Sequence, residues 1–167
     1  DLSLNVSREI LQKDRQKDPA AGYARDGVPM LAELWPAAAK HGVKFVLNAG
    51  GLNPEGAREA IARTFHEKGW KAKIATVTGD SVLERIDELR AAGEALAHMD
   101  TGADIAPIRA RMLFASAYLG AQPIAEALAR GADIVLTGRV ADAALTLGPL
   151  AHEFGWKWDD WDRMAAG

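Results

Sequence analysis

The sequence predicts an α/β fold in which an open, mostly parallel sheet carries helices on both faces. Short apolar runs alternate along the chain with longer segments of helical periodicity. Polar turns follow these runs at residues 48–53, 78–81, 116–120 and 137–142. Because strands and helices alternate, the connections should be right-handed crossovers between parallel strands.

Composition excludes several classes of function. A chain of 167 residues fits one domain with a hydrophobic core, and its net charge of −3 offers no electrostatic footprint for nucleic acid or an anionic membrane. No apolar run approaches the roughly 20 residues of a membrane span. Cysteine is absent, which excludes disulfides and cysteine nucleophiles and fits a reducing compartment. We therefore expect a cytoplasmic protein.

The first elements are two helices and a strand. A helix over residues 7–17 should end at Asp18-Pro19, and Asp26 should cap a second helix that runs to about residue 40. Pro36 should kink or restart that helix. The run 43–47 is too short for a buried helix and indicates a strand covered on both faces.

The central part of the chain continues the alternation. Asn53 should cap a helix over residues 54–68 that opens with Pro54 and ends at Gly69. Its buried face should hold Ala57, Ala60, Ile61 and Phe65. A strand at 73–78 follows, and the capping-box spacing of Ser81 and Glu84 predicts a helix over 82–92. Residues 93–109 lack a clear period and form the longest irregular segment.

The remaining elements are shorter. We expect a third strand at 111–116, a helix at 121–130 with Pro123 in its first turn, and a fourth strand at 133–137. Two further helices are predicted at 140–147 and 159–165. The sequence shows no internal repeat and no low-complexity linker.

The turns that follow the strands are the predicted ligand site, because ligands bind beyond the carboxyl ends of parallel strands. Gly50 and Gly51 allow a sharp turn that exposes backbone amides near a helix N-terminus, where an anion could bind. The candidate substrate-binding residues are Asn48, Gly50, Gly51, Asn53, Asp80, Ser116, Thr137 and Arg139.

Arg139 is the most informative of these residues. An arginine directly after a strand-ending Thr-Gly could hold a carboxylate or phosphate through two parallel N–H bonds. Alternatively, Arg139 and Asp142 form an ion pair that only fixes the turn. Asp142 could serve as a base if it is partly desolvated, although the nearby arginine favours its ionised form. Asp80 could equally be a helix cap, a role for which Ser81 competes.

The sequence lacks both standard nucleotide signatures, G-x-G-x-x-G after a strand and G-x-x-x-x-G-K-[ST], and we predict no cofactor. His41 and His66 fall in the last turns of predicted helices, where the helix dipole favours a cation. His98 lies in the long irregular segment and is the better catalytic candidate. His152-Glu153 lacks the second histidine of a metal-binding helix, so no metal is predicted.

The end of the chain is dense in tryptophan and aspartate, from Phe154 to Asp162. Acidic residues between aromatic ones argue against nucleic acid, which requires basic partners. We favour large side chains that close the core over a cation site or a partner site.

Four blocks of sequence carry a resemblance to a known family. They are Asn48-Ala-Gly-Gly-Leu-Asn-Pro54, Ala117-Tyr-Leu-Gly-Ala121, Gly131-Ala-Asp-Ile-Val-Leu-Thr-Gly-Arg-Val-Ala-Asp142, and His152-Glu-Phe-Gly-Trp156 with Asp159-Asp-Trp-Asp162. Over essentially its whole length the chain resembles the acyclic terpene utilisation proteins. The family often has Asn where Ser116 stands, which weakens any role for that position.

The resemblance implies a part in the bacterial breakdown of citronellol- and geraniol-type terpenes through acyl-CoA intermediates. It gives a pathway and no catalytic residues. One hypothesis is a cytoplasmic enzyme domain for a carboxylated or CoA-linked isoprenoid, in which Asp142 or His98 moves a proton. The other is a non-catalytic subunit or binding module that assembles with acyl-CoA enzymes of the pathway.

The resemblance also implies a longer polypeptide. The chain is similar to the interior of the family's N-terminal domain, with a further strand and glycine-rich loop before Asp1. Without that strand an interior edge of the sheet would be unpaired. We therefore expect the 167-residue chain either to belong to a longer polypeptide or to self-associate through an open edge.

Overall fold

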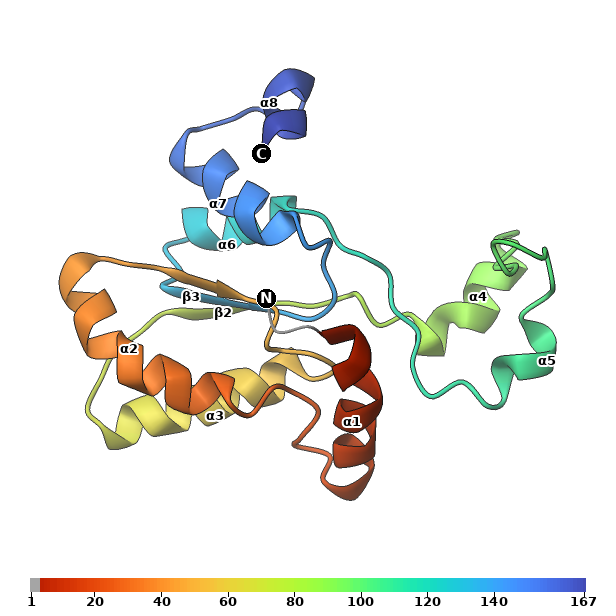
Figure 1. Ribbon diagram of the computed structural model, residues 1–167, viewed down its shortest axis with the longest axis horizontal. Helices are drawn as coiled ribbons and strands as arrows, with labels where there is room; N and C mark the ends of the chain where they lie inside the picture. The colour runs from red at the N-terminus through yellow and green to blue at the C-terminus, as the bar shows by residue number, and fades with distance from the viewer. Residues whose placement is uncertain (1–3) are drawn as a thin grey trace.

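The computed structural model describes residues 4–167 and contains a three-stranded parallel sheet (Figure 1). The strands are β1 (Phe45–Leu47), β2 (Ile74–Val77) and β3 (Ile134–Thr137), in the order β1-β3-β2. Phe45 and Ile74 both pair with Ile134, so the three strands begin in register. The predicted α/β fold with an open parallel sheet is confirmed.

The central strand is β3, although it is the last strand in the chain. Every residue of β3 is buried, whereas the residues of β1 are half-buried and those of β2 are half-buried up to Val77. The strand predicted at residues 43–47 is present as 45–47, and its side chains pack into the clusters on both faces, but it is half-buried where full burial was expected. In the described residues β1 is an edge strand, and Val43 before it is exposed.

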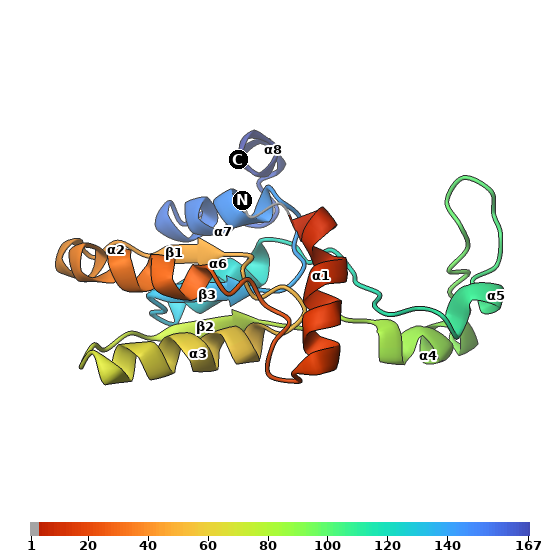
Figure 2. The ribbon, with the colours of Figure 1, turned by 60° about the horizontal axis from the view of Figure 1, so that its bottom comes forward.

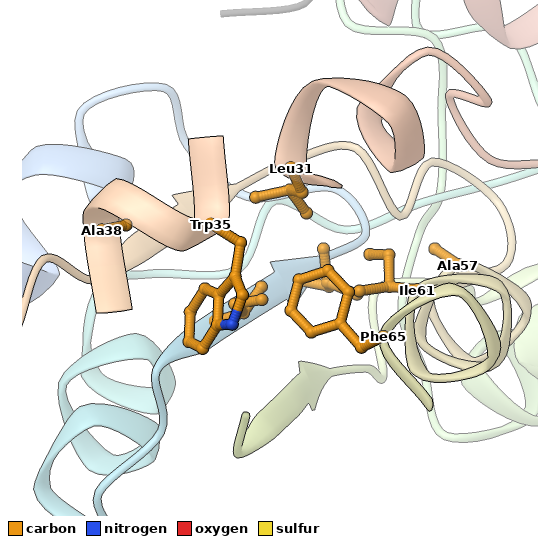
Figure 3. Close-up of a cluster of buried hydrophobic side chains, with 8 residues drawn as sticks. Leu31, Trp35, Ala38, Ala57, Ile61 and Phe65 are labelled. Carbon is orange, nitrogen blue, oxygen red and sulfur yellow. The ribbon is translucent and has the colours of Figure 1, made fainter. Parts of the chain in front are cut away.

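One face of the sheet is covered by α2 (Gly27–His41) and α3 (Pro54–Glu67). Their apolar side chains meet in one cluster, where the rings of Trp35 and Phe65 lie 5.1 Å apart (Figure 3). Ala57, Ile61 and Phe65 are buried as predicted, while Ala60 is half-buried. This cluster attaches α3, and with it the turn that precedes α3, to the central strand.

The other face is covered by α6 (Gln122–Ala129) and α7 (Ala144–Glu153), so that α3 and α7 lie on opposite sides of the strands (Figure 2). Ile124 and Leu128 pack with Val135 in a second core cluster. The two helices approach closely at Gly148, where an added Cβ would lie 2.7 Å from Ile124. Helices on both faces of the sheet are therefore confirmed.

The helix ends follow some of the predicted capping signals. Asn53 caps α3 by accepting a hydrogen bond from the Gly56 N–H, and Pro54 is its first residue. Asp26 has helical dihedral angles and makes no capping hydrogen bond, so its predicted role was wrong. Helix α2 continues through Pro36 without a restart, and α1 (Leu4–Lys17) matches the first predicted helix.

Between β2 and α6 the chain leaves the sheet as an arm of residues 83–113 (Figure 1). It contains a 3₁₀ turn at Leu83–Arg85, α4 (Ile86–Ala91) and α5 (Ala106–Arg109). Ile86 is its only buried residue. Two ion pairs tie it together, Arg90–Asp104 and Arg109–Asp87, each with a nitrogen–oxygen distance of 3.1 Å.

Two predictions about this region were wrong. The capping box at Ser81 is absent, because Ser81 instead forms an antiparallel bridge with Ser116, and the helix begins as a 3₁₀ turn. Residues 111–116 are not a strand, since that single bridge is their only β pairing in the described chain. An apolar run becomes a strand only where a neighbouring strand can accept its hydrogen bonds.

The C-terminal helices are shifted from their predicted positions. Val140 forms a parallel bridge with Leu119, and α7 begins only at Ala144. Asp160 caps α8 (Trp161–Ala166). Phe154 and Trp161 are exposed, so the prediction that these aromatic residues close the core was wrong. In the part of the chain that the structure describes, no helix has the length and apolar character to cross a membrane.

Candidate functional site

The four predicted strand-end turns converge at the carboxyl edge of the sheet. The turn after β1 packs on the end of β3 through Gly50 and Thr137. The turn after β2 contacts the end of β3 through Asp80 and Arg139. The segment before α6 joins them, because Ala117 donates its N–H to the Asp80 carbonyl at 2.7 Å. The structure thus brings together side chains that lie far apart in the sequence.

In the turn after β1, the closest packing occurs at Gly50. A Cβ at this position would lie 2.5 Å from the Thr137 carbonyl oxygen and 2.9 Å from the Pro54 side chain. Gly51 has a φ of +56°, and its N–H donates to the carbonyl of the buried Asn48 at 3.3 Å. The Gly51 amide therefore stabilises the turn in this structure and is not directed at a ligand.

The Asn53 side chain forms hydrogen bonds with backbone groups. Its Nδ2 donates to the carbonyls of Ala20 and Ala21 at 3.2 and 3.0 Å, while its Oδ1 accepts from the Gly56 N–H. Both ends of the side-chain amide are thus used to fasten the start of α3 to the loop before α2. This arrangement favours a structural role for Asn53.

Asp80 is buried, with 6% of its surface exposed, and it holds the backbone of the β3 turn. Its Oδ2 accepts the Arg139 N–H at 2.8 Å. A Cβ at Gly138 would lie 2.4 Å from Oδ1 of Asp80, so only glycine fits against this carboxylate. Asp80 therefore fastens the ends of β2 and β3 to each other and does not cap a helix.

The Arg139 guanidinium lies against the ring and the hydroxyl of Tyr118. Arg139 is 5% exposed, its Nη2 donates to the Tyr118 hydroxyl at 2.7 Å, and its Cζ lies 4.1 Å from the centre of the ring. The Tyr118 ring itself is 63% exposed. A neutral phenol, in both hydrogen-bonding and cation–π contact, is therefore the closest side-chain partner that the structure gives this cation.

Asp142 is the carboxylate partner of Arg139, at 3.8 Å from Nη1, and its side chain is 65% exposed. This is the ion pair expected if Arg139 and Asp142 only fix the turn. Its nitrogen–oxygen distance is longer than that of a hydrogen bond. The partial desolvation that a basic Asp142 would require is not observed.

Thr137 and Ser116 complete the converging turns. Thr137 is fully buried, and its hydroxyl donates to the Gly138 carbonyl at 3.1 Å. Ser116 is half-buried and pairs with Ser81 in the antiparallel bridge. Both residues lie at the predicted edge, and their described contacts are with the chain itself.

A cleft of about 390 Å³, here called the strand-end cleft, adjoins these turns. Asp80 belongs both to this cleft and to the buried contact with Arg139. Helix α1 contributes a polar wall that sequence reasoning missed, because helical periodicity does not show where a helix packs. The lining residues are Gln12, Arg15, Gln16, Leu52, Asp80, Ser81, Leu83, Glu84, Leu113 and Phe114.

His98 lies in the arm, which projects from the sheet in Figures 1 and 2. Its exposed ring accepts hydrogen bonds at Nδ1 from the N–H groups of Asp100 and Thr101, at 3.2 and 3.3 Å. The structure does not bring His98 to the strand-end turns. Within the described residues, no three or more metal-ligating side chains gather to form a metal site.

Comparison with protein families gives a match over residues 1–167, to the family described as Acyclic terpene utilisation family protein AtuA. No curated protein and no solved structure matches the chain.

Proposed function

We propose, from the premise that the chain belongs to the acyclic terpene utilisation family, that it is an enzyme domain for a carboxylated or CoA-linked isoprenoid intermediate. Family membership supports terpene utilisation in general. The reaction and the substrate class are our proposal, which rests on the chemistry of the strand-end turns.

The observation that carries the proposal is the buried Arg139 guanidinium. It lies at the carboxyl end of the central strand, with a neutral tyrosine at 2.7 Å and an exposed aspartate at 3.8 Å. A buried charge is costly unless it is closely paired. A ligand carboxylate or phosphate would supply two parallel hydrogen bonds, which an arginine is shaped to give.

The neighbouring residues would then have separate roles. Asp80 is a positioning residue, because it holds the Arg139 backbone and lines the strand-end cleft. Asp142, the carboxylate beside Arg139, would move a proton only if a bound ligand excluded water from its side chain, which is 65% exposed. His98 could share that role only if the arm folded over the turns. The apolar part of the ligand would lie along Leu52, Leu83 and Phe114 of the cleft.

The test is binding of geranate, an acyclic isoprenoid carboxylate, with the corresponding alcohol geraniol as the control ligand. We expect calorimetry to detect geranate and not geraniol. Arg139→Lys should weaken geranate binding by about tenfold or more, because lysine cannot form the two parallel hydrogen bonds. Arg130→Lys, at an exposed arginine, is the matched control and should leave the affinity unchanged.

One combination of results would contradict the proposal. If Arg139→Lys lowers the melting temperature while geranate and geraniol bind equally or not at all, Arg139 is a structural residue.

A second candidate function is a non-catalytic subunit, which the exposed aromatic residues favour. Trp161 is 75% exposed, and Phe154, also exposed, stacks on Trp156 with ring centres 5.9 Å apart. Aromatic residues on a surface are typical of partner interfaces. Affinity purification from terpene-grown cells should then recover a stoichiometric partner, and Trp161→Ala should release it. Geranate turnover by the isolated protein would exclude this role.

A further inference from the structure

Tyr118 covers the guanidinium on which the proposed function depends. The Tyr118 ring lies across the guanidinium, with its centre 4.1 Å from Cζ of Arg139, and its hydroxyl accepts a hydrogen bond from Nη2. The two residues differ sharply in exposure, because 63% of the Tyr118 surface but only 5% of the Arg139 surface is exposed. The Arg139 cation is therefore shielded in part by a side chain that itself lies mostly in solvent.

This cover stands in the way of a two-point grip on a ligand anion. An arginine holds a carboxylate through one of two edges of the guanidinium, either Nη1 with Nη2 or Nε with Nη2. Both edges use Nη2, which donates to the Tyr118 hydroxyl at 2.7 Å. With 5% of Arg139 exposed, a carboxylate has no room alongside either edge while the ring stays in place. A ligand that binds Arg139 must therefore displace Tyr118.

The backbone on either side of Tyr118 is fixed, so the side chain can move alone. The N–H of Ala117 donates to the Asp80 carbonyl at 2.7 Å. The N–H of Leu119 donates to the Arg139 carbonyl at 3.2 Å, and Leu119 also takes part in a parallel β bridge. An exposed side chain changes rotamer rapidly, and rotation of the ring about its Cα–Cβ bond would leave these backbone hydrogen bonds in place.

We propose that Tyr118 is a gate over Arg139, closed in this structure, which opens when the ring swings away to admit the ligand anion. The gate rests on the proposed function, since it controls access to the same guanidinium. When closed it stabilises the buried cation, because the phenol accepts an N–H and the ring face attracts the positive charge. Opening costs both contacts, so the apparent dissociation constant for an anion is the intrinsic constant divided by the open fraction.

Binding of geranate to Tyr118 variants tests the gate. Tyr118→Phe keeps the ring and removes the hydrogen bond to Nη2, so the open fraction should rise and geranate should bind about tenfold more tightly. Tyr118→Ala removes the ring as well and should bind at least as tightly as Tyr118→Phe. Tyr23→Phe removes the hydroxyl of the other tyrosine, which packs against the core cluster of α2 and α3. It is the matched control and should bind geranate as the wild type does.

Labelling with phenylglyoxal, which modifies accessible arginine side chains, measures the cover without any ligand. We expect Arg139 to react slowly in the wild type and about tenfold faster in Tyr118→Ala, as read by peptide mass spectrometry. Arg130, whose side chain is 77% exposed, is the internal reference and should react equally in both proteins. Equal labelling of Arg139 in the two proteins, or weaker geranate binding by Tyr118→Phe, would overturn the gate.

The two measurements separate the gate from the function on which it rests. If geranate binds through Arg139 and neither Tyr118 variant alters its affinity, the gate is refuted and the proposed function stands. If no variant binds geranate while Tyr118→Ala exposes Arg139 to phenylglyoxal, the proposed substrate is wrong and Tyr118 still controls access to Arg139.

Discussion

Gly50→Ala is expected to lower the free energy of unfolding by about 1–3 kcal/mol, the range for forcing extra atoms into a closely packed site. The new methyl group would lie 2.5 Å from the Thr137 carbonyl oxygen and 2.9 Å from the Pro54 ring. Neither neighbour can move easily, because Thr137 is the end of the fully buried β3 and Pro54 begins α3. Urea denaturation would measure the loss.

Gly120→Ala is the matched control for Gly50→Ala. An added Cβ at Gly120 would meet nothing within 4 Å, so we expect a change within about 0.5 kcal/mol. Equal effects of the two substitutions would contradict the close contact between the turn after β1 and the end of β3. The comparison therefore tests directly whether the strand-end turns converge.

Elements with strong local signals were predictable from the sequence. Helix α3 has a capping residue, a proline at its start, an apolar face and a glycine after its end, and all four signals appear in the structure. Strand β3 is a short apolar run that ends at Thr137 before a glycine. These features depend on neighbouring residues in the chain, so a single sequence suffices to detect them.

Features that depend on distant partners were not predictable. Residues 111–116 have a strand-like composition, but among the residues that the structure describes only Ser116 of this run forms a bridge, because no described strand lies alongside the rest. Strand order also depends on distant partners, since nothing local to residues 43–47 shows that β1 pairs, within residues 4–167, with β3 alone. The exposure of Trp161 likewise depends on what packs above it.

The candidate site was predictable only in part, because its location follows from topology while its side-chain contacts depend on distant residues. Topology alone places Gly50, Asp80 and Arg139 at one edge of the sheet, and the structure brings their turns together. The contact of the Tyr118 ring with the Arg139 guanidinium, and the polar wall that α1 contributes to the strand-end cleft, became visible only in the tertiary structure. His98 was proposed from its segment, and that segment projects from the sheet instead of facing the site.

Asp80→Ala is expected to be the most damaging change among the polar residues of the site. It would leave the buried Arg139 N–H without its acceptor at 2.8 Å, and an unsatisfied buried donor costs about 1–3 kcal/mol. The turn that carries the Arg139 side chain would also lose its link to β2. We therefore expect a lower melting temperature together with weaker geranate binding.

Asp80→Asn distinguishes the hydrogen bond that Asp80 accepts from the Arg139 N–H from the effect of its negative charge. An asparagine retains one oxygen that can accept the Arg139 N–H, so most of the stability should return if the hydrogen bond is what matters. Asp142→Asn, at an exposed carboxylate, is the control and should change stability by less than about 0.5 kcal/mol. If Asp80→Asn is as unstable as Asp80→Ala, the negative charge beside Arg139 is required, and Asp80 acts on the guanidinium as well as on the backbone. If instead Asp80→Ala unfolds at the wild-type urea concentration, the fastening of β2 to β3 through Asp80 is not what holds the site together.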